Sequence, residues 1–73
     1  MTNESKTIFC TNPRYSVYFM WTGEKYLAIA QIEDGESYGG ASYWFSIGYY
    51  KSMKSAIRFA NKQLAKHNLE LAA

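Results

Sequence analysis

Residues 15–33 read YSVYFMWTGEKYLAIAQIE, and this stretch decides the fold because it predicts a β-hairpin. Residues 15–22 and 25–33 are rich in aromatic and β-branched side chains, which favour strands. The Gly23-Glu24 pair between them is typical of a two-residue type II′ turn, in which glycine comes first. The sequence thus predicts two antiparallel strands joined by a tight turn.

The position of the turn fixes which residues of the hairpin face each other. Side chains alternate between the two faces of a strand, so every second pair shares one face. On that face, large residues of the first strand lie opposite small ones of the second, and the alanines leave room for a helix. The predicted pairs are Trp21–Tyr26, Phe19–Ala28, Val17–Ala30 and Tyr15–Ile32.

Two further strands are predicted beside the hairpin. Residues 41–50 (ASYWFSIGYY) form the next strand, and Tyr43, Phe45 and Ile47 extend the hairpin face that carries the alanines. Residues 6–10 (KTIFC) form an edge strand, and the turn after it is indicated by Pro13, which fixes φ.

The segment after residue 50 predicts one helix. Ser52 is a residue type favoured at the N-cap, and the helical pattern runs to about Asn68 or Leu69. Its apolar residues fall on one stripe, which predicts packing on the alanine-bearing face of the hairpin: Met53, Ala56, Ile57, Ala60, Leu64 and Leu71. The predicted fold class is therefore α+β, a three- to four-stranded antiparallel sheet with one C-terminal helix packed on one face.

The 73 residues predict a single domain spanning 1–73, with residues 1–7 flexible. A chain this short buries only about 60% of its unfolded surface, so self-association or a partner is expected to add stability. Cys10 and His67 are the only residues of their types, which excludes an internal disulfide and an ordinary zinc site. No cofactor and no metal is expected.

The sequence also predicts where the protein resides. No apolar run approaches the roughly 20 residues needed to cross a bilayer. The N-terminal segment MTNESKTIFC lacks the basic-then-apolar layout of a secretion signal. A cytoplasmic location without membrane association is expected.

Charge is divided unevenly along the chain. Residues 1–50 hold three basic against five acidic residues, a balance of −2, whereas residues 51–73 hold five against one, a balance of +4. Lys54, Arg58, Lys62 and Lys66 follow one another at intervals of four in the predicted helix, with no acid among them. Each like-charge pair at this spacing destabilises a helix by about 0.2–0.5 kcal/mol.

Two interpretations of this basic row are open. It is either a solvated helix face or a contact surface for phosphates or an acidic protein. Phe59 is predicted to lie beside the row, away from the core stripe. In the second interpretation, Phe59 is an aromatic anchor within that surface.

The face of the predicted sheet that the helix leaves uncovered is also a candidate site. A solvated sheet face is normally polar, but this one carries Tyr18, Met20, Leu27, Ile29 and Trp44. Either the N-terminal segment, with Ile8 and Phe9, folds over this face, or a second copy or another partner binds there.

Catalytic signatures are weak in this sequence. Glu33, Asp34 and Glu36 cluster in one predicted loop but have no accompanying base, nucleophile or metal-ligand spacing. Gly39-Gly40 lacks the strand–loop–helix context of a phosphate-binding loop. The protein is not expected to be an enzyme.

Two resemblances bear on function. YLAIAQIE followed by FSIGYYKSMKSAIRFANKQL resembles, in its order of strands and helix, the AP2-type and integrase arm-binding domains, and this implies a sheet lying in the DNA major groove. Those domains read DNA with Arg and Trp side chains of the sheet, whereas this sheet offers only Lys25. In size and composition the chain also resembles small phage and mobile-element proteins of the anti-CRISPR type, which implies a role as an anti-defence inhibitor.

The leading hypothesis is a binding protein that blocks or modulates a larger protein or nucleoprotein complex. The basic helix face and the aromatic sheet face are its expected contact surfaces, and a homodimer is a further expectation. The alternative is a nucleic-acid-binding module that uses the basic helix. Salt-dependent binding to arbitrary DNA or RNA distinguishes the two, because phosphate contacts release counterions.

Overall fold

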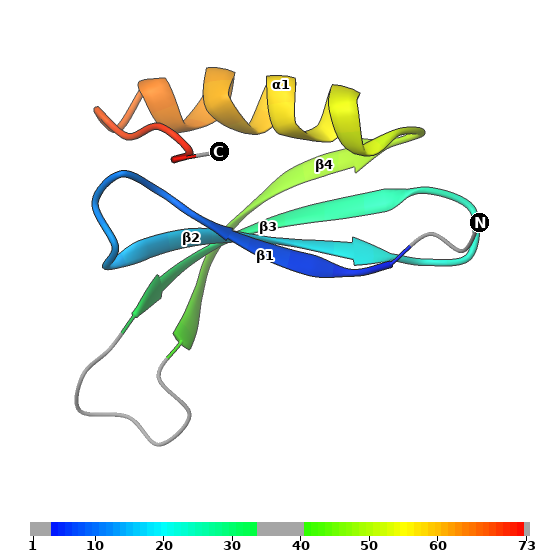
Figure 1. Cartoon of the computed structure of the whole chain (residues 1–73), viewed down its shortest axis with the longest axis horizontal. Helices are drawn as coiled ribbons and strands as arrows, with labels where there is room; N and C mark the ends of the chain where they lie inside the picture. Colours follow the sequence, from blue (N-terminus) through cyan, green and yellow to red (C-terminus); the bar gives the residue numbers. More distant parts are fainter. Residues whose placement is uncertain (1–3, 34–40, 73) are drawn as a thin grey trace.

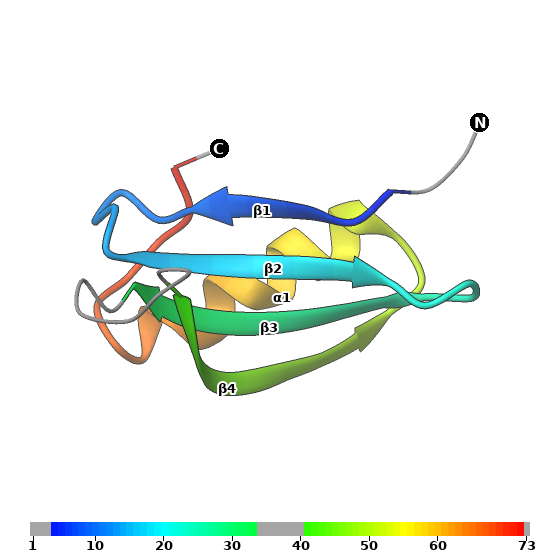
Figure 2. The ribbon, with the colours of Figure 1, turned by 90° about the horizontal axis from the view of Figure 1, so that it is seen from below.

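The computed structural model describes residues 4–33 and 41–72, and within them it contains four strands and one helix. The strands form one open antiparallel sheet in the order β1-β2-β3-β4, and α1 covers one of its faces (Figures 1 and 2). The predicted fold class is confirmed. The elements are β1 (Lys6–Phe9), β2 (Tyr15–Trp21), β3 (Tyr26–Glu33), β4 (Ala41–Tyr50) and α1 (Met53–Ala65).

The central hairpin of β2 and β3 has the predicted register. Trp21 pairs with Tyr26, and the pairing continues without a shift to Tyr15 and Ile32. Gly23 has a φ of 102°, in the left-handed region that a turn glycine adopts without strain. The N–H of Thr22 donates to the carbonyl of Lys25 at 2.9 Å and closes the turn.

The N-terminal segment adds a strand to the sheet. Ile8 pairs with Val17 and is buried on the helix side, whereas Phe9 pairs with Ser16 and is 53% exposed on the other side. The alternative that both side chains fold over the open face of the sheet is therefore wrong, because alternation sends neighbouring residues of a strand to opposite faces. β1 begins at Lys6, inside the segment 1–7 that the sequence predicts to be flexible.

Strand β4 is irregular. Its register against β3 shifts between Ala28 and Ile29 and again between Ala30 and Gln31. Each shift inserts an extra residue in β4, as in a β-bulge, and these extra residues are Ile47 and Trp44. Strict alternation therefore does not hold along this strand.

The bulges change the predicted face of β4 at one position. Phe45 and Ile47 both pack against the core, as predicted. Tyr43, however, pairs with Gln31 and not with a residue of the alanine-bearing face. The sequence-based prediction assumed period 2 over the whole strand, and two bulges break that period.

Helix α1 begins where the sequence predicts and ends earlier. Ser52 has extended backbone angles, and its Oγ accepts a hydrogen bond from the N–H of Ser55 at 3.2 Å, as an N-cap does. The helix ends at Ala65 rather than near Asn68. Asn68 has a φ of 60°, and the N–H of Leu69 donates back to the carbonyl of Leu64 at 3.0 Å. Asparagine adopts this left-handed conformation more readily than most residues and reverses the chain.

The reversed C-terminal tail runs beside β1. Leu71 forms an isolated bridge with Cys10, and the N–H of Ala72 donates to the carbonyl of Phe9 at 2.9 Å. The N–H of Leu71 donates to Oδ1 of Asn61 in α1 at 2.8 Å, which ties the tail to the helix. Leu71 is thus buried, as its place in the apolar stripe suggested, but from the tail and not from the helix.

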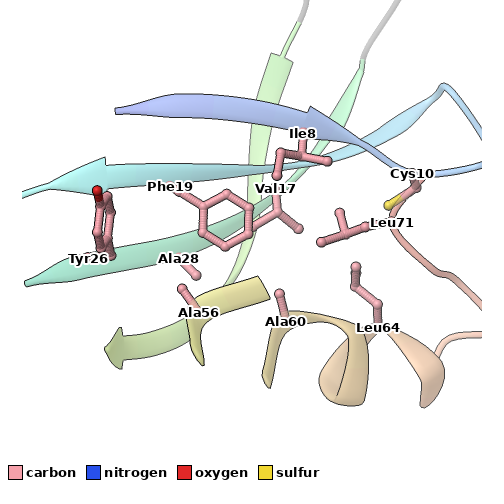
Figure 3. Packing of buried hydrophobic residues seen from close by; sticks show 10 residues of the cluster. All are labelled: Ile8, Cys10, Val17, Phe19, Tyr26, Ala28, Ala56, Ala60, Leu64 and Leu71. Atoms are coloured by element: carbon pink, nitrogen blue, oxygen red, sulfur yellow. The ribbon is translucent and has the colours of Figure 1, made fainter. Parts of the chain in front are cut away.

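The core lies between α1 and the sheet (Figure 3). Ala56, Ala60 and Leu64 of the helix are fully buried, and they face the fully buried side chains of β2 and β3. Ile57 packs against this cluster but is only partly buried. The closest part of the helix–sheet contact is therefore made by alanines, and Leu64 is the large helical residue that fills the core.

We expect Leu64→Ala to lower the free energy of unfolding by about 2–5 kcal/mol, as leucine truncations in closed cores do. Ile57→Ala should have a smaller effect, because part of that side chain already contacts water. Urea denaturation of the two variants tests the ranking. A larger loss for Ile57→Ala would contradict the packing described above.

Candidate partner-binding surfaces

The basic row, defined as Lys54, Arg58, Lys62 and Lys66, lies on the outer side of α1. All four residues are exposed. A step of four residues advances about 40° around a helix, so this row runs parallel to the buried row of Ala56, Ala60 and Leu64. The two rows are centred on opposite sides of the helix. The basic row therefore points directly away from the sheet.

The charges of the basic row destabilise α1. The helix has no acidic residue in its first turn, and Lys54 occupies that turn. The positive end of the helix dipole lies there, and a cation at that end is unfavourable. Three successive like-charge pairs add an opposing contribution on the order of 1 kcal/mol. Lys62, in the last turn, is the member that the dipole favours.

Phe59 lies beside the basic row, as the sequence predicts, and it also contacts β4. Its ring stacks on that of Tyr50, with centroids 5.2 Å apart and an interplanar angle of 6°, and its exposure is 37%. The guanidinium of Arg58 lies 5.9 Å from the Phe59 centroid. The helical spacing of the sequence predicts the outer flank of α1 for Phe59, but it does not show that β4 reaches this flank. Phe59 thus contacts both β4 and a member of the basic row.

A glycine in β4 makes room for this stack. Gly48 has a φ of 146°, and a Cβ at this position would lie 3.0 Å from Oη of Tyr50. The Tyr50 hydroxyl donates to the carbonyl of Ile47 at 3.4 Å, so the ring lies back along its own strand. A side chain at residue 48 would displace Tyr50 and, with it, the support for Phe59.

We predict that Phe59→Ala lowers the free energy of unfolding by more than 0.5 kcal/mol, because an aromatic pair contributes about 0.5–1.5 kcal/mol beyond its buried area. A double-mutant cycle with Tyr50→Ala, measured by urea denaturation, should give a coupling of that size. Additive effects of the two substitutions would show that the stack contributes nothing.

Trp44 does not lie on the open face of the sheet, which corrects the sequence-based assignment. Its ring centroid is 5.2 Å from that of Tyr15 and 4.8 Å from that of His67, which follows the helix. Phe45 is 5.0 Å from the same histidine. The bulge at Trp44 brings two consecutive side chains to the helix side. His67 thus packs on aromatic rings at the end of α1.

The open face of the sheet is the side turned away from α1, which Figure 2 views directly. By the strand registers, Glu33 at the end of β3 holds a position on this side, as do Ala41 and Tyr43 of β4. Ten further residues, all uncharged and all with described side chains, also alternate onto it. They are Thr7, Phe9, Ser16, Tyr18, Met20, Leu27, Ile29, Gln31, Ser46 and Tyr49.

Apolar residues occupy the centre of the open face, on β2 and β3. Tyr18 pairs with Ile29, and Met20 pairs with Leu27, at the centre of the sheet. These four side chains are half-buried, whereas Phe9 and Tyr49 at the two sides are 53% and 58% exposed. Aromatic residues and Met in such a patch are typical of interface cores. Sequence reasoning missed Phe9 and Tyr49, because their faces depend on pairing that only the fold shows.

Groups suited to catalysis do not converge in the described parts of the chain. Residues 4–33 and 41–72 contain no cluster of three or more His, Cys, Asp or Glu that could hold a metal ion. Burial raises the pKa of the Cys10 thiol, which disfavours the nucleophilic thiolate. Asp34, Glu36 and Gly39-Gly40 lie outside the described residues. No helix in these ranges is both long and apolar enough to traverse a bilayer.

No family model, curated protein or solved structure matches this chain. The resemblances to AP2-type domains and to small anti-defence proteins stay predictions. The candidate surfaces are therefore assigned on their own geometry.

Proposed function

We propose that this protein is a non-enzymatic binding protein that uses the basic row of α1 to occupy an acidic surface on a larger protein or nucleoprotein complex. The observation that carries this proposal is the arrangement of four exposed cations on one helix face, directly opposite the buried alanine row. The inhibition of a defence complex, which the phage resemblance implies, is part of the same proposal.

The basic row destabilises α1 electrostatically, and this favours a binding role over a merely solvated face. A solvated helix gains stability from mixed charges and from acids in its first turn. This helix has neither, since its 13 residues contain three of the four cations and no acid. A contact with an acidic partner would offset the repulsion, and the long-range field of the row would accelerate association.

The distribution of charge favours an acidic protein surface over nucleic acid. The whole chain has a net charge of +2 and a pI of about 8.7, below the value above 9 typical of nucleic-acid-binding domains. At the open face of the sheet, the described residues offer phosphates one cation, Lys25 at the margin. The row also contains a single arginine, the residue that most often reads base edges.

Lys54→Glu should move stability and binding in opposite directions. It places an acid in the first turn and replaces a like-charge pair with Arg58 by an attractive pair, so the free energy of unfolding should rise by about 1 kcal/mol. Affinity for an acidic partner should fall, because the charge is inverted where complementarity is needed. Urea denaturation and a binding assay on the same samples test this pair of effects.

A direct binding test uses two anionic probes, poly-L-glutamate and a 20-base-pair DNA duplex, with the double variant Lys54→Glu/Lys62→Glu. We expect the wild type to bind polyglutamate in 150 mM salt and the double variant to bind at least tenfold more weakly. Arg14→Glu is the control, because Arg14 is an exposed cation outside the helix, in the turn between β1 and β2.

The same experiment separates the alternative function. Tighter binding to DNA than to polyglutamate, with a logarithmic salt slope of about −3 or steeper, would favour a nucleic-acid-binding module instead. If the double variant and Arg14→Glu lose the same amount of affinity for polyglutamate, the basic row is not a specific contact surface.

A further inference from the structure

We propose that the open face of the sheet is the interface of a homodimer in which two copies pack sheet against sheet, with their helices on the outside. The occupant of the face is thus a second copy of this chain. The bivalent binding that a dimer would allow rests on the proposed function. The dimer itself is inferred from independent features of the structure.

The composition of the open face makes it complementary to itself. The centre of the face is uncharged, because its two charged positions, Lys25 and Glu33, lie at opposite ends of β3, so two copies can pack their centres together without burying a charge. Leu27 and Ile29 at the centre are aliphatic, and Tyr18 and Met20 lie beside them on the adjacent strand. Lys25 lies at the margin, where its ammonium is 5.2 Å from the Tyr49 ring centroid. The centre of this face offers a charged heterologous partner no group to pair with.

The distribution of charge selects sheet-to-sheet packing over pairing through the free edge of β4. Edge pairing around a two-fold axis would leave both helices on the same side of a continuous sheet. α1 packs on β2, β3 and β4, so the two basic rows would then point to the same side of one continuous sheet. In the sheet-to-sheet dimer the helices are about 30 Å apart, given layers about 10 Å thick. That separation exceeds the Debye length of about 8 Å.

The bulges in β4 also disfavour edge pairing. Register shifts at Ile47 and Trp44 interrupt the regular alternation of the strand, and bulges of this kind protect sheet edges from pairing. The outer edge of β1 is already contacted by the tail through Leu71 and Ala72. The open face is therefore the large apolar surface left for association.

The size of the face sets the expected strength of the dimer. Four strands spaced about 4.8 Å apart and about 25 Å long give roughly 500 Å² of projected area on each copy. Two copies would bury on the order of 1,000 Å², at the lower limit for specific interfaces. A dissociation constant in the micromolar range is therefore expected.

Dimerisation would make the binding protein bivalent. The two basic rows would point in opposite directions, so one dimer could contact two acidic surfaces at once and bridge them. Bridging would increase the overall affinity for a repetitive or symmetric complex without any new contact. The Lys54→Glu variant, altered only on the outer face, should dimerise like the wild type, so loss of partner binding and loss of dimerisation are separable.

Sedimentation velocity between 5 and 500 µM tests the dimer. We expect a concentration-dependent shift from monomer to dimer for the wild type. Ile29→Lys places a charge at the centre of the open face and should weaken the dimer at least tenfold, while far-UV circular dichroism stays unchanged. Ala65→Lys is the matched control, because it adds the same charge at an exposed position on the helix. This control should dimerise like the wild type.

A wild type that remains monomeric at 500 µM would overturn the proposal. A dimer that survives Ile29→Lys with unchanged strength would also overturn it and would assign association to another surface. If Ile29→Lys loses its fold, Tyr49→Lys, at an exposed position on the side of the same face, provides the second test. It should weaken the dimer while the fold is retained, and an unaffected dimer in that variant would count against the proposal.

Discussion

The close contact of small residues between α1 and the sheet is the constraint on which the other features depend. Ala56 and Ala60 on the helix meet a surface that includes Ala28, and all three are fully buried (Figure 3). Close approach lets Phe19 and Leu64, both fully buried, fill the remaining space. Because this contact fixes both the rotation of the helix and the face of the sheet it covers, it also determines which surfaces remain free.

Two free surfaces follow from that arrangement, and their chemistry differs. The outer side of the helix carries the basic row, which is charged throughout, whereas the centre of the open face of the sheet is uncharged. The sheet lies between them, so a partner on one surface does not obstruct the other. This separation is what makes an acidic partner and a second copy compatible on so small a protein.

Much of this arrangement was predictable from the sequence because local signals agreed. Gly23 fixed the turn, the turn fixed the register of β2 and β3, and Ser52 fixed the start of the helix. Trp44 was misplaced for a physical reason: its contact with His67 follows a bulge in β4, and a bulge leaves no reliable periodic signal. The site of Leu71 likewise depends on the left-handed Asn68, which turns the tail back to β1.

The central claim is that the two surfaces act independently, and nuclear magnetic resonance of the ¹⁵N-labelled protein tests it most directly. Raising the protein concentration should shift the amide signals of the open face, including Tyr18, Leu27 and Ile29. Adding poly-L-glutamate should instead shift those of Lys54, Arg58 and Lys62 and leave the first set in place. Perturbation of the same residues by both titrations would contradict the division of the molecule into two separate binding surfaces.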